Sequence, residues 1–535
     1  MKNIFSNNLS TFKAVLWIVF SIVFLPEKFV FGQREEINKA KYLMEADQMG
    51  KAITLLNQTI QTYPAASFLN YHLGMAQLKN AQRNLAATSF DKGISVDKEE
   101  PLNYVGRGCL SILEDNVQKA QMDFDKALAM TKSKNVEVLN AVGEAYLNDS
   151  RLADKAITVL AKAKSIDDHK AETFILLGDA YLAQNNGGLA VTNYERASSF
   201  DTKSAKPYYK IGLVYLRSRN FTGAQDAFNK AIQIDAAYTL AYKELGELYY
   251  QLKEGPNAVK AYETYISLTD NPESAKLRLA FFLVMAKDFA KANQLFQEFA
   301  QSKDVTPTTL RFYALSLYEE GNYERSKQIF EQYFSKANNE ADANDYAIYA
   351  KLLLKQNEDS LAILHLQKSL TMRTDQPEIM RTLAETFYKA KKFPEAIKAY
   401  ARLNGLKAKQ ASQDVYTLGR AYYFNNQYEQ ADSTFQQLIS MQPNMTVGYL
   451  WEARTKSNLD PESEKGLAQP YYSKLIEMAQ ATPEKNKGDL VEAYSYLGYY
   501  HLLKQELVAS KSYWKKVLEL NPEDVRAKEA LKAIN

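Results

Sequence analysis

Small and apolar residues recur along this chain with a period close to 34 residues. The reference is the Leu245-Gly246 pair; stepping by 34 residues, with occasional short insertions, finds Gly or Ala at each equivalent position. These fourteen positions are Ala40, Gly74, Gly108, Gly143, Gly178, Gly212, Gly246, Ala280, Ala314, Ala350, Ala384, Gly419, Ala453 and Gly498. A fixed period of this length is typical of arrays in which each repeat is one supersecondary unit.

Two further columns follow the first small residue of most repeats. Twelve positions later stand Ala52, Ala86, Ala120, Ala190, Ala224, Ala258, Ala292, Ser326, Ala362, Ala396 and Ala431. Four positions beyond these stand Leu56, Phe90, Phe124, Tyr194, Phe228, Tyr262, Phe296, Phe330, Leu366, Tyr400 and Phe435. Two facing small residues let helix axes approach to about 8 Å, and the large residue then fills the remaining space. The columns therefore predict one antiparallel helix pair in each repeat.

Turn and breaker residues agree with these pairs. The turns Arg219-Asn220-Phe221 and Gly321-Asn322-Tyr323 each place an aromatic ring where it can pack the second helix against the first. Three prolines, Pro64, Pro443 and Pro522, fall where the second helix should stop, because proline has no amide donor.

The pattern departs from regularity in two places. In the fourth repeat the second small residue slips by one position to Ala156, and the thirteenth repeat carries an insertion around residues 460–463. Helix lengths stay open at both places. A last amphipathic stretch over residues 523–534 is expected to cap the apolar face of the final pair, as the end of a repeat array requires.

The columns resemble the tetratricopeptide repeat family, whose pattern is Leu-Gly followed by a Tyr three residues after the Gly, and then the Ala and aromatic columns. The matching tyrosines are Tyr146, Tyr181, Tyr215, Tyr249 and Tyr422. This resemblance covers residues 33–535. It implies an all-α fold, a right-handed α-solenoid of about fourteen antiparallel helix pairs in which the first helix of each pair lines a concave groove.

The amino terminus has the pattern of an export signal. Two lysines precede an apolar run over residues 14–25, and the small residue Gly32 is the expected cleavage point. The alternative is an uncleaved membrane anchor, but the run is shorter than the ~20 residues needed to span a bilayer. We therefore expect a signal peptide over 1–32, a periplasmic or secreted repeat array over 33–535, and no stable membrane insertion.

Composition and motifs argue against several other classes of function. Lys and Arg total 66 against 63 Asp and Glu, so no strong field is available to attract nucleic acid. The sequence has no phosphate loop, no His-Glu-x-x-His motif and no Gly-x-Ser-x-Gly elbow, so we expect no enzyme activity, cofactor or metal. The lone Cys109 and the four histidines are expected to be packing or helix-surface residues: His72, His169, His365 and His501.

The groove face of the last repeats is the candidate binding surface. Residues three before, one after and four after the small position are expected to line it, and they are rich in Tyr and Arg, which are enriched in protein interfaces. The candidate peptide-binding residues are Tyr416, Arg420, Tyr423, Trp451, Arg454 and Tyr499. Packing of these rings between repeats is the alternative interpretation, and the sequence leaves both open.

The pattern favours a scaffold of the cell envelope that binds protein or peptide partners in its groove. Family members that grip a chaperone's terminal carboxylate use a Lys and an Asn around one small residue. Here Lys243 is matched with Glu247 and Arg381 with Glu385, and a glutamate would repel the carboxylate. The alternative function is a structural subunit of an envelope secretion, assembly or motility complex.

Overall fold

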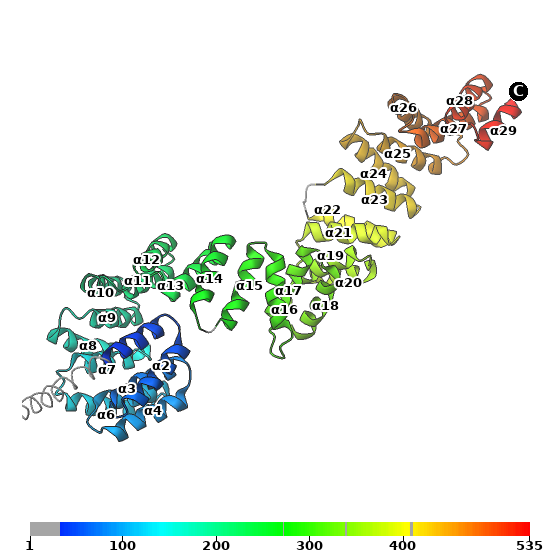
Figure 1. Ribbon diagram of the computed structural model, residues 1–535. Helices are drawn as coiled ribbons and strands as arrows, with labels where there is room; N and C mark the ends of the chain where they lie inside the picture. Colours follow the sequence, from blue (N-terminus) through cyan, green and yellow to red (C-terminus); the bar gives the residue numbers. More distant parts are fainter. Residues whose placement is uncertain (1–32, 271, 338–339, 407–409, 535) are drawn as a thin grey trace, which may run out of the picture. The chain divides into compact units, whose positions relative to one another are not determined.

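The computed structural model describes residues 33–270, 272–337, 340–406 and 410–534, so the expected signal peptide lies outside the described residues. Within these ranges all regular secondary structure is helical, with fourteen helix pairs, a single last helix and no strand (Figure 1). The chain divides into two compact units, of which unit 1 ends at Ser302 and unit 2 begins at Lys303. The predicted all-α solenoid of about fourteen pairs is thereby confirmed.

Unit 1 contains the first eight pairs, and in each pair the two helices pack against each other. The pairs are residues 33–45 with α2 (Met49–Thr62), α3 (Phe68–Lys79) with α4 (Arg83–Val96), α5 (Pro101–Leu113) with α6 (Val117–Met130), α7 (Val136–Tyr146) with α8 (Ala153–Ile166), α9 (Ala171–Ala183) with α10 (Gly187–Phe200), α11 (Lys206–Arg217) with α12 (Phe221–Ile234), α13 (Thr239–Gln251) with α14 (Gly255–Leu268), and α15 (Glu273–Met285) with α16 (Phe289–Ala300).

Unit 2 contains the remaining six pairs and the last helix. The pairs are α17 (Pro307–Glu320) with α18 (Tyr323–Lys336), α19 (Ala343–Lys355) with α20 (Asp359–Met372), α21 (Pro377–Lys389) with α22 (Phe393–Gly405), α23 (Ser412–Phe424) with α24 (Tyr428–Met441), α25 (Thr446–Leu459) with α26 (Gln469–Ala479), and α27 (Lys487–Leu503) with α28 (Leu507–Leu520). The single helix α29 (Val525–Ile534) packs on α28 and buries Ala527 completely, so it covers the final pair.

The small columns lie where the two helices of a pair come closest. A Cβ atom added to Gly178 would stand 2.3 Å from Cε1 of Tyr194, and one added to Gly419 would stand 2.6 Å from Cε1 of Phe435. Both rings are completely buried. The aromatic ring of the second helix therefore rests directly on the glycine of the first, which confirms the packing that the columns predict.

The turn within a pair shares one backbone feature in most of the array. In twelve of the fourteen pairs the residue seven positions after the first small residue has a positive φ, and only Gly321 among them is a glycine. The exceptions are the two places where the sequence pattern departs from regularity. The fourth repeat inserts the 3-10 helix η1 (Ser150–Leu152), and in the thirteenth repeat residues 460–468 connect α25 to α26.

In unit 1 the first repeat contacts repeats far along the chain. The Glu45 carboxylate lies 3.0 Å from the ammonium of Lys206, and Tyr265 donates a 2.8 Å hydrogen bond to Asp47. The amide of Lys51 donates to the carboxylate of Asp270 at 3.1 Å. These contacts join repeat 1 to repeats 6 and 7, so coupling in unit 1 extends beyond sequence neighbours.

Candidate functional site

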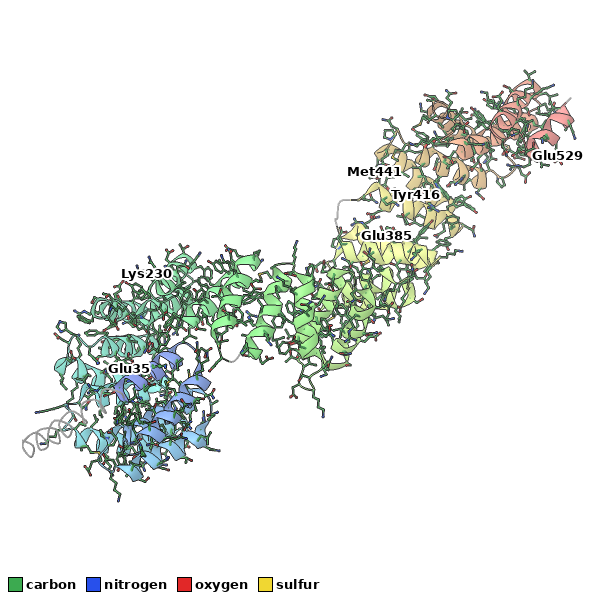
Figure 2. The ribbon with its side chains drawn as sticks, viewed as in Figure 1. Glu35, Lys230, Glu385, Tyr416, Met441 and Glu529 are labelled. Carbon is green, nitrogen blue, oxygen red and sulfur yellow. The ribbon has the colours of Figure 1, made fainter. Side chains whose placement is uncertain are left out.

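Three first helices of unit 2, α21, α23 and α25, lie next to one another and form the surface on which most of the candidate residues stand. We call this surface the first-helix face. Figure 2 labels Tyr416 on α23 and Glu385 on α21. Burial, followed by the charge of Asp414, raises the pKa of the Glu385 carboxyl group.

The centre of the face is Arg420, which is surrounded by aromatic rings. Its guanidinium carbon lies 4.8 Å from the ring centroid of Trp451 and 5.3 Å from those of Tyr388 and Tyr416, with Phe424 at 5.7 Å. A cation over aromatic faces at these distances is attracted by the ring quadrupoles. We call these five residues the arginine cluster.

Only some of the hydrogen-bond donors of Arg420 have partners. Nη1 donates to the hydroxyl of Tyr416 at 3.3 Å, whereas Nε is buried and has no hydrogen-bond partner among the residues that the structure describes. Within the same ranges no ion pair joins Arg420 to a carboxylate. The other arginines on first helices of unit 2 do have one: Arg311 pairs with Asp345, Arg381 with Asp414 and Arg454 with Glu492.

Trp451 is the buried member of the arginine cluster and is not part of its surface. It is 7% exposed, stacks on Phe435 at 6.0 Å and contacts Tyr423 edge-on at 5.2 Å. The hydroxyl of Tyr423 accepts a 3.1 Å hydrogen bond from Asn458. Trp451 therefore packs between repeats, as the alternative interpretation of the sequence predicts, while Tyr416 and Tyr423 are partly exposed.

Arg454 is held by the chain itself. Its Nε and Nη2 donate to the two carboxylate oxygens of Glu492 at 2.8 and 2.7 Å, and its guanidinium lies 4.7 Å from the ring of Trp451. The hydrogen bonds to Glu492 raise the pKa of Arg454 further. This bidentate pair uses two of the five N–H donors of the guanidinium and neutralises its charge within the chain.

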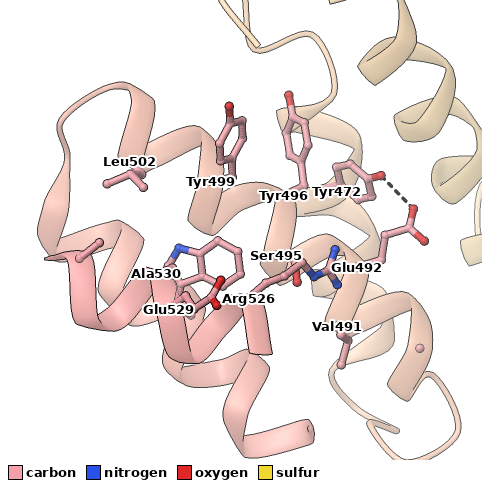
Figure 3. A pocket seen from close by; sticks show the side chains of 13 residues that line it. Tyr472, Val491, Glu492, Ser495, Tyr496, Tyr499, Leu502, Arg526, Glu529 and Ala530 are labelled. Atoms are coloured by element: carbon pink, nitrogen blue, oxygen red, sulfur yellow. Dashed lines mark hydrogen bonds between the residues drawn. The ribbon is translucent and has the colours of Figure 1, made fainter. Parts of the chain in front are cut away.

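Tyr499 lies apart from the cluster. It is 46% exposed and lines a pocket of about 860 Å³ formed by α27 and α29 with contributions from α26 and α28 (Figure 3). Glu492 and Tyr472 also line this pocket, and Tyr472 donates to Glu492 at 2.9 Å. Because Glu492 also holds Arg454, the pocket adjoins the arginine cluster through this ion pair.

Sequence reasoning missed three residues of the site. Tyr388 is four residues after Ala384 and satisfies the same helical rule as Tyr423, so extending the rule by one repeat would have found it. Phe424 and Glu492 are outside that rule. Glu492 reaches Arg454 across the enlarged thirteenth repeat, whose geometry the sequence pattern left open.

Several cations on the equivalent face of unit 1 are paired within the chain. Lys210 lies 2.9 Å from the Asp179 carboxylate, Arg278 pairs with Glu247, and Lys206 contacts both Glu172 and Glu45. These three cations differ in this respect from Arg420.

The histidines and the cysteine occupy packing or surface positions, as predicted. Burial lowers the pKa of His72 to about 3 and raises the pKa of the Cys109 thiol to about 12, so neither is charged or reactive near neutral pH. His365 is packed among the rings of Phe334, Tyr346 and Tyr349. In the described ranges no group of His, Cys, Asp or Glu side chains is arranged to hold a metal ion.

Comparison with known proteins agrees with this architecture. A family model described as TPR repeat matches residues 178–218, and models described as tetratricopeptide repeat match residues 209–275 and 415–445. The C-terminal part of a TPR repeat-containing protein from Cytophaga hutchinsonii is 34% identical, covering 48% of this chain and 99% of that one, with a TM-score of 0.40. The chain belongs to the tetratricopeptide repeat family.

Other solved structures of tetratricopeptide repeat proteins are more distant. The TPR domain of P58(IPK) is 16% identical, covering 74% of this chain and 99% of that one, with a TM-score of 0.28. YrrB, described as a TPR protein with an unusual peptide-binding site, is 18% identical over 35% of this chain and 96% of its own, with a TM-score of 0.23. No curated protein matches the sequence. Tetratricopeptide repeat proteins act in general as non-catalytic interaction scaffolds.

None of the helices in the described part of the chain combines the length and apolarity needed to cross a membrane.

Proposed function

We propose that this tetratricopeptide repeat protein is a scaffold of the cell envelope that binds a polypeptide partner on the first-helix face of unit 2. The observation that supports this most directly is the arginine cluster, where partly exposed aromatic rings surround a cation that has no carboxylate partner in the described chain. Tyr, Trp and Arg are the residue types that most often dominate binding energy in protein interfaces. A preformed face also limits the ordering cost of binding to the partner.

The double substitution Tyr416→Ala with Tyr423→Ala is expected to weaken partner capture about thirtyfold, because truncating interface hot spots typically costs ~2 kcal/mol or more. Helix content should stay unchanged, since both rings are partly exposed. The measurement is affinity capture from the native envelope followed by identification and titration of what is retained. The matched control is Leu361→Ala with Leu364→Ala on the second helix α20, which should capture normally.

A structural subunit of an envelope complex is the second candidate function, and exposed apolar residues on α20 favour it. Leu361 and Leu364 are 45% and 57% exposed and lie three residues apart, so they share one side of this helix. If the Leu361/Leu364 variant lost capture while the Tyr416/Tyr423 variant kept it, this second function would replace the first.

The proposed location in the envelope is supported by the signal pattern of residues 1–32. Natively produced protein is expected to begin near Gln33 and to be recovered from the periplasm or the medium. Amino-terminal sequencing decides this directly, and an intact Met1 on protein from the cytoplasm would contradict it.

A further inference from the structure

The groove arginines of unit 2 follow a rule that Arg420 breaks. Arg311 and Arg381 each stand three residues before the small position of their repeat, and each pairs with an aspartate of the next repeat. Those aspartates, Asp345 and Asp414, both stand five residues before the next small position. In each case one repeat supplies the cation and the following repeat supplies its carboxylate, as Arg454 and Glu492 also do, and we call these three pairs the ladder. Arg420 stands at the same position as Arg454, one residue after the small residue of its repeat, but has no such pair among the described residues.

The carboxylate that would pair with Arg420 is missing from repeat 13. The residues of this repeat equivalent to Asp414 and Glu492 are Gly448 and Val447, and neither carries a carboxylate. Glu492 of repeat 14 already has a partner, because both of its carboxylate oxygens accept hydrogen bonds from Arg454. The described chain therefore holds Arg420 between two completed ion pairs, Arg381 with Asp414 and Arg454 with Glu492, without completing a third.

The aromatic rings make this unpaired cation suited to a carboxylate. They remove water from the faces of the guanidinium, which leaves its buried Nε without a partner and raises the strength of any charge-assisted hydrogen bond made at its open edge. A carboxylate arriving there would meet the terminal Nη groups of Arg420, because Nε is buried. The partly exposed rings of Tyr388 and Tyr416 would contact the methylene groups that carry it.

We propose that Arg420 selects a polypeptide segment bearing a glutamate or aspartate side chain, which takes the place of the missing carboxylate in the ladder. This inference rests on the polypeptide-binding function proposed above and names the chemistry of its partner. A side-chain carboxylate is favoured over a chain terminus because the ladder of this unit is built from side-chain carboxylates of neighbouring helices, and the partner would extend the same arrangement. The segment would run along α21, α23 and α25.

The test uses the intact chain and three synthetic libraries of twelve-residue peptides without other acidic residues. One library has Glu fixed at its sixth position, the second has Gln there, and both end in an amide; the third has Gln and a free terminal carboxylate. We expect the Glu library to be retained at least tenfold more strongly than the Gln library. Arg420→Gln should abolish that preference, whereas Arg402→Gln should leave it intact, since Arg402 is an exposed arginine of the second helix α22.

The outcomes separate this inference from the function on which it rests. Equal retention of the Glu and Gln libraries would overturn carboxylate selection while polypeptide binding stood. Preference for the free terminus alone would overturn the side-chain assignment. Retention of none of the libraries would count against both proposals. A preference that survived Arg420→Gln would show that another cation selects the carboxylate, and Arg420→Lys, which keeps the charge but loses the planar fork, should recover only part of it.

Discussion

Replacing Gly246 by leucine is expected to lower the stability of unit 1 by about 3 kcal/mol, the upper part of the range for overpacking a tight core. The first atom added to Gly246 would already stand 2.7 Å from Cδ2 of Tyr262 and 3.3 Å from Cε2 of Phe282. Both rings are buried, and Tyr262 contacts Phe282 at 4.8 Å. The helix pair α13 and α14 must therefore separate to admit the side chain.

The loss of stability should also affect the first repeat. Tyr262 contacts Tyr265 at 5.1 Å, and Tyr265 donates the hydrogen bond to Asp47 that helps hold repeat 1 against repeat 7. Hydrogen exchange should show lost protection in repeats 6 to 8 and at the amide of Lys51, which is bonded to Asp270. The control is Gly405→Leu, because none of the described residues places an atom within 4 Å of its added Cβ. Unchanged exchange near Gly246 would contradict the assigned repeat frame.

Replacing Glu452 by glutamine should stabilise unit 2 at alkaline pH. Glu452 is completely buried on α25, and burial together with the adjacent carboxylate of Asp432 raises its pKa to about 9. The folded chain therefore retains a proton on Glu452 that the unfolded chain releases near the ordinary pKa of this side chain, about 4.5. The full shift corresponds to about 6 kcal/mol, and relaxation around the buried group brings the expected gain nearer 3 kcal/mol at pH 9.

The direction of this pKa shift determines how the stability difference between the two chains should change with pH. The stability of the natural chain is highest, as far as this group is concerned, below the unfolded pKa and falls as the pH rises from about 4.5 towards 9. Denaturant unfolding of the Glu452→Gln variant should match the natural chain near pH 4.5 and exceed it increasingly up to pH 9. Glu429→Gln, an exposed change on α24, should show no such divergence. Parallel stability curves for Glu452→Gln would contradict a buried neutral acid.

The repeat columns predicted nearly all of the fold because each column describes packing between residues close together in the sequence. A glycine such as Gly178 and the ring of Tyr194 sixteen residues later specify how one helix pair packs, and that information recurs in each repeat. The ends of second helices could also be predicted from nearby residues, since α2, α24 and α28 each end two residues before a proline. What the period could not give was contact between distant repeats. The hydrogen bond from Tyr265 to Asp47 spans 218 positions and has no counterpart in the columns.

The candidate site could be predicted only in part, for a related reason. Helical phase placed Tyr416, Arg420 and Tyr423 on one face, and the structure brings them together around Trp451. Helical phase alone does not predict which arginine forms an ion pair with a carboxylate of the same chain. Arg454 pairs with Glu492 across the insertion of the thirteenth repeat, whereas Arg420 has no carboxylate partner among the described residues.

The most direct measurement of the central claim is photo-crosslinking in the native cells. A benzoylphenylalanine placed at Tyr423, on the first-helix face of unit 2, is compared with one placed at Leu364, on the second helix α20. Binding of a polypeptide against the arginine cluster predicts adducts with a second protein from position 423 and none from position 364. Adducts from position 364 alone, with none from position 423, would contradict it.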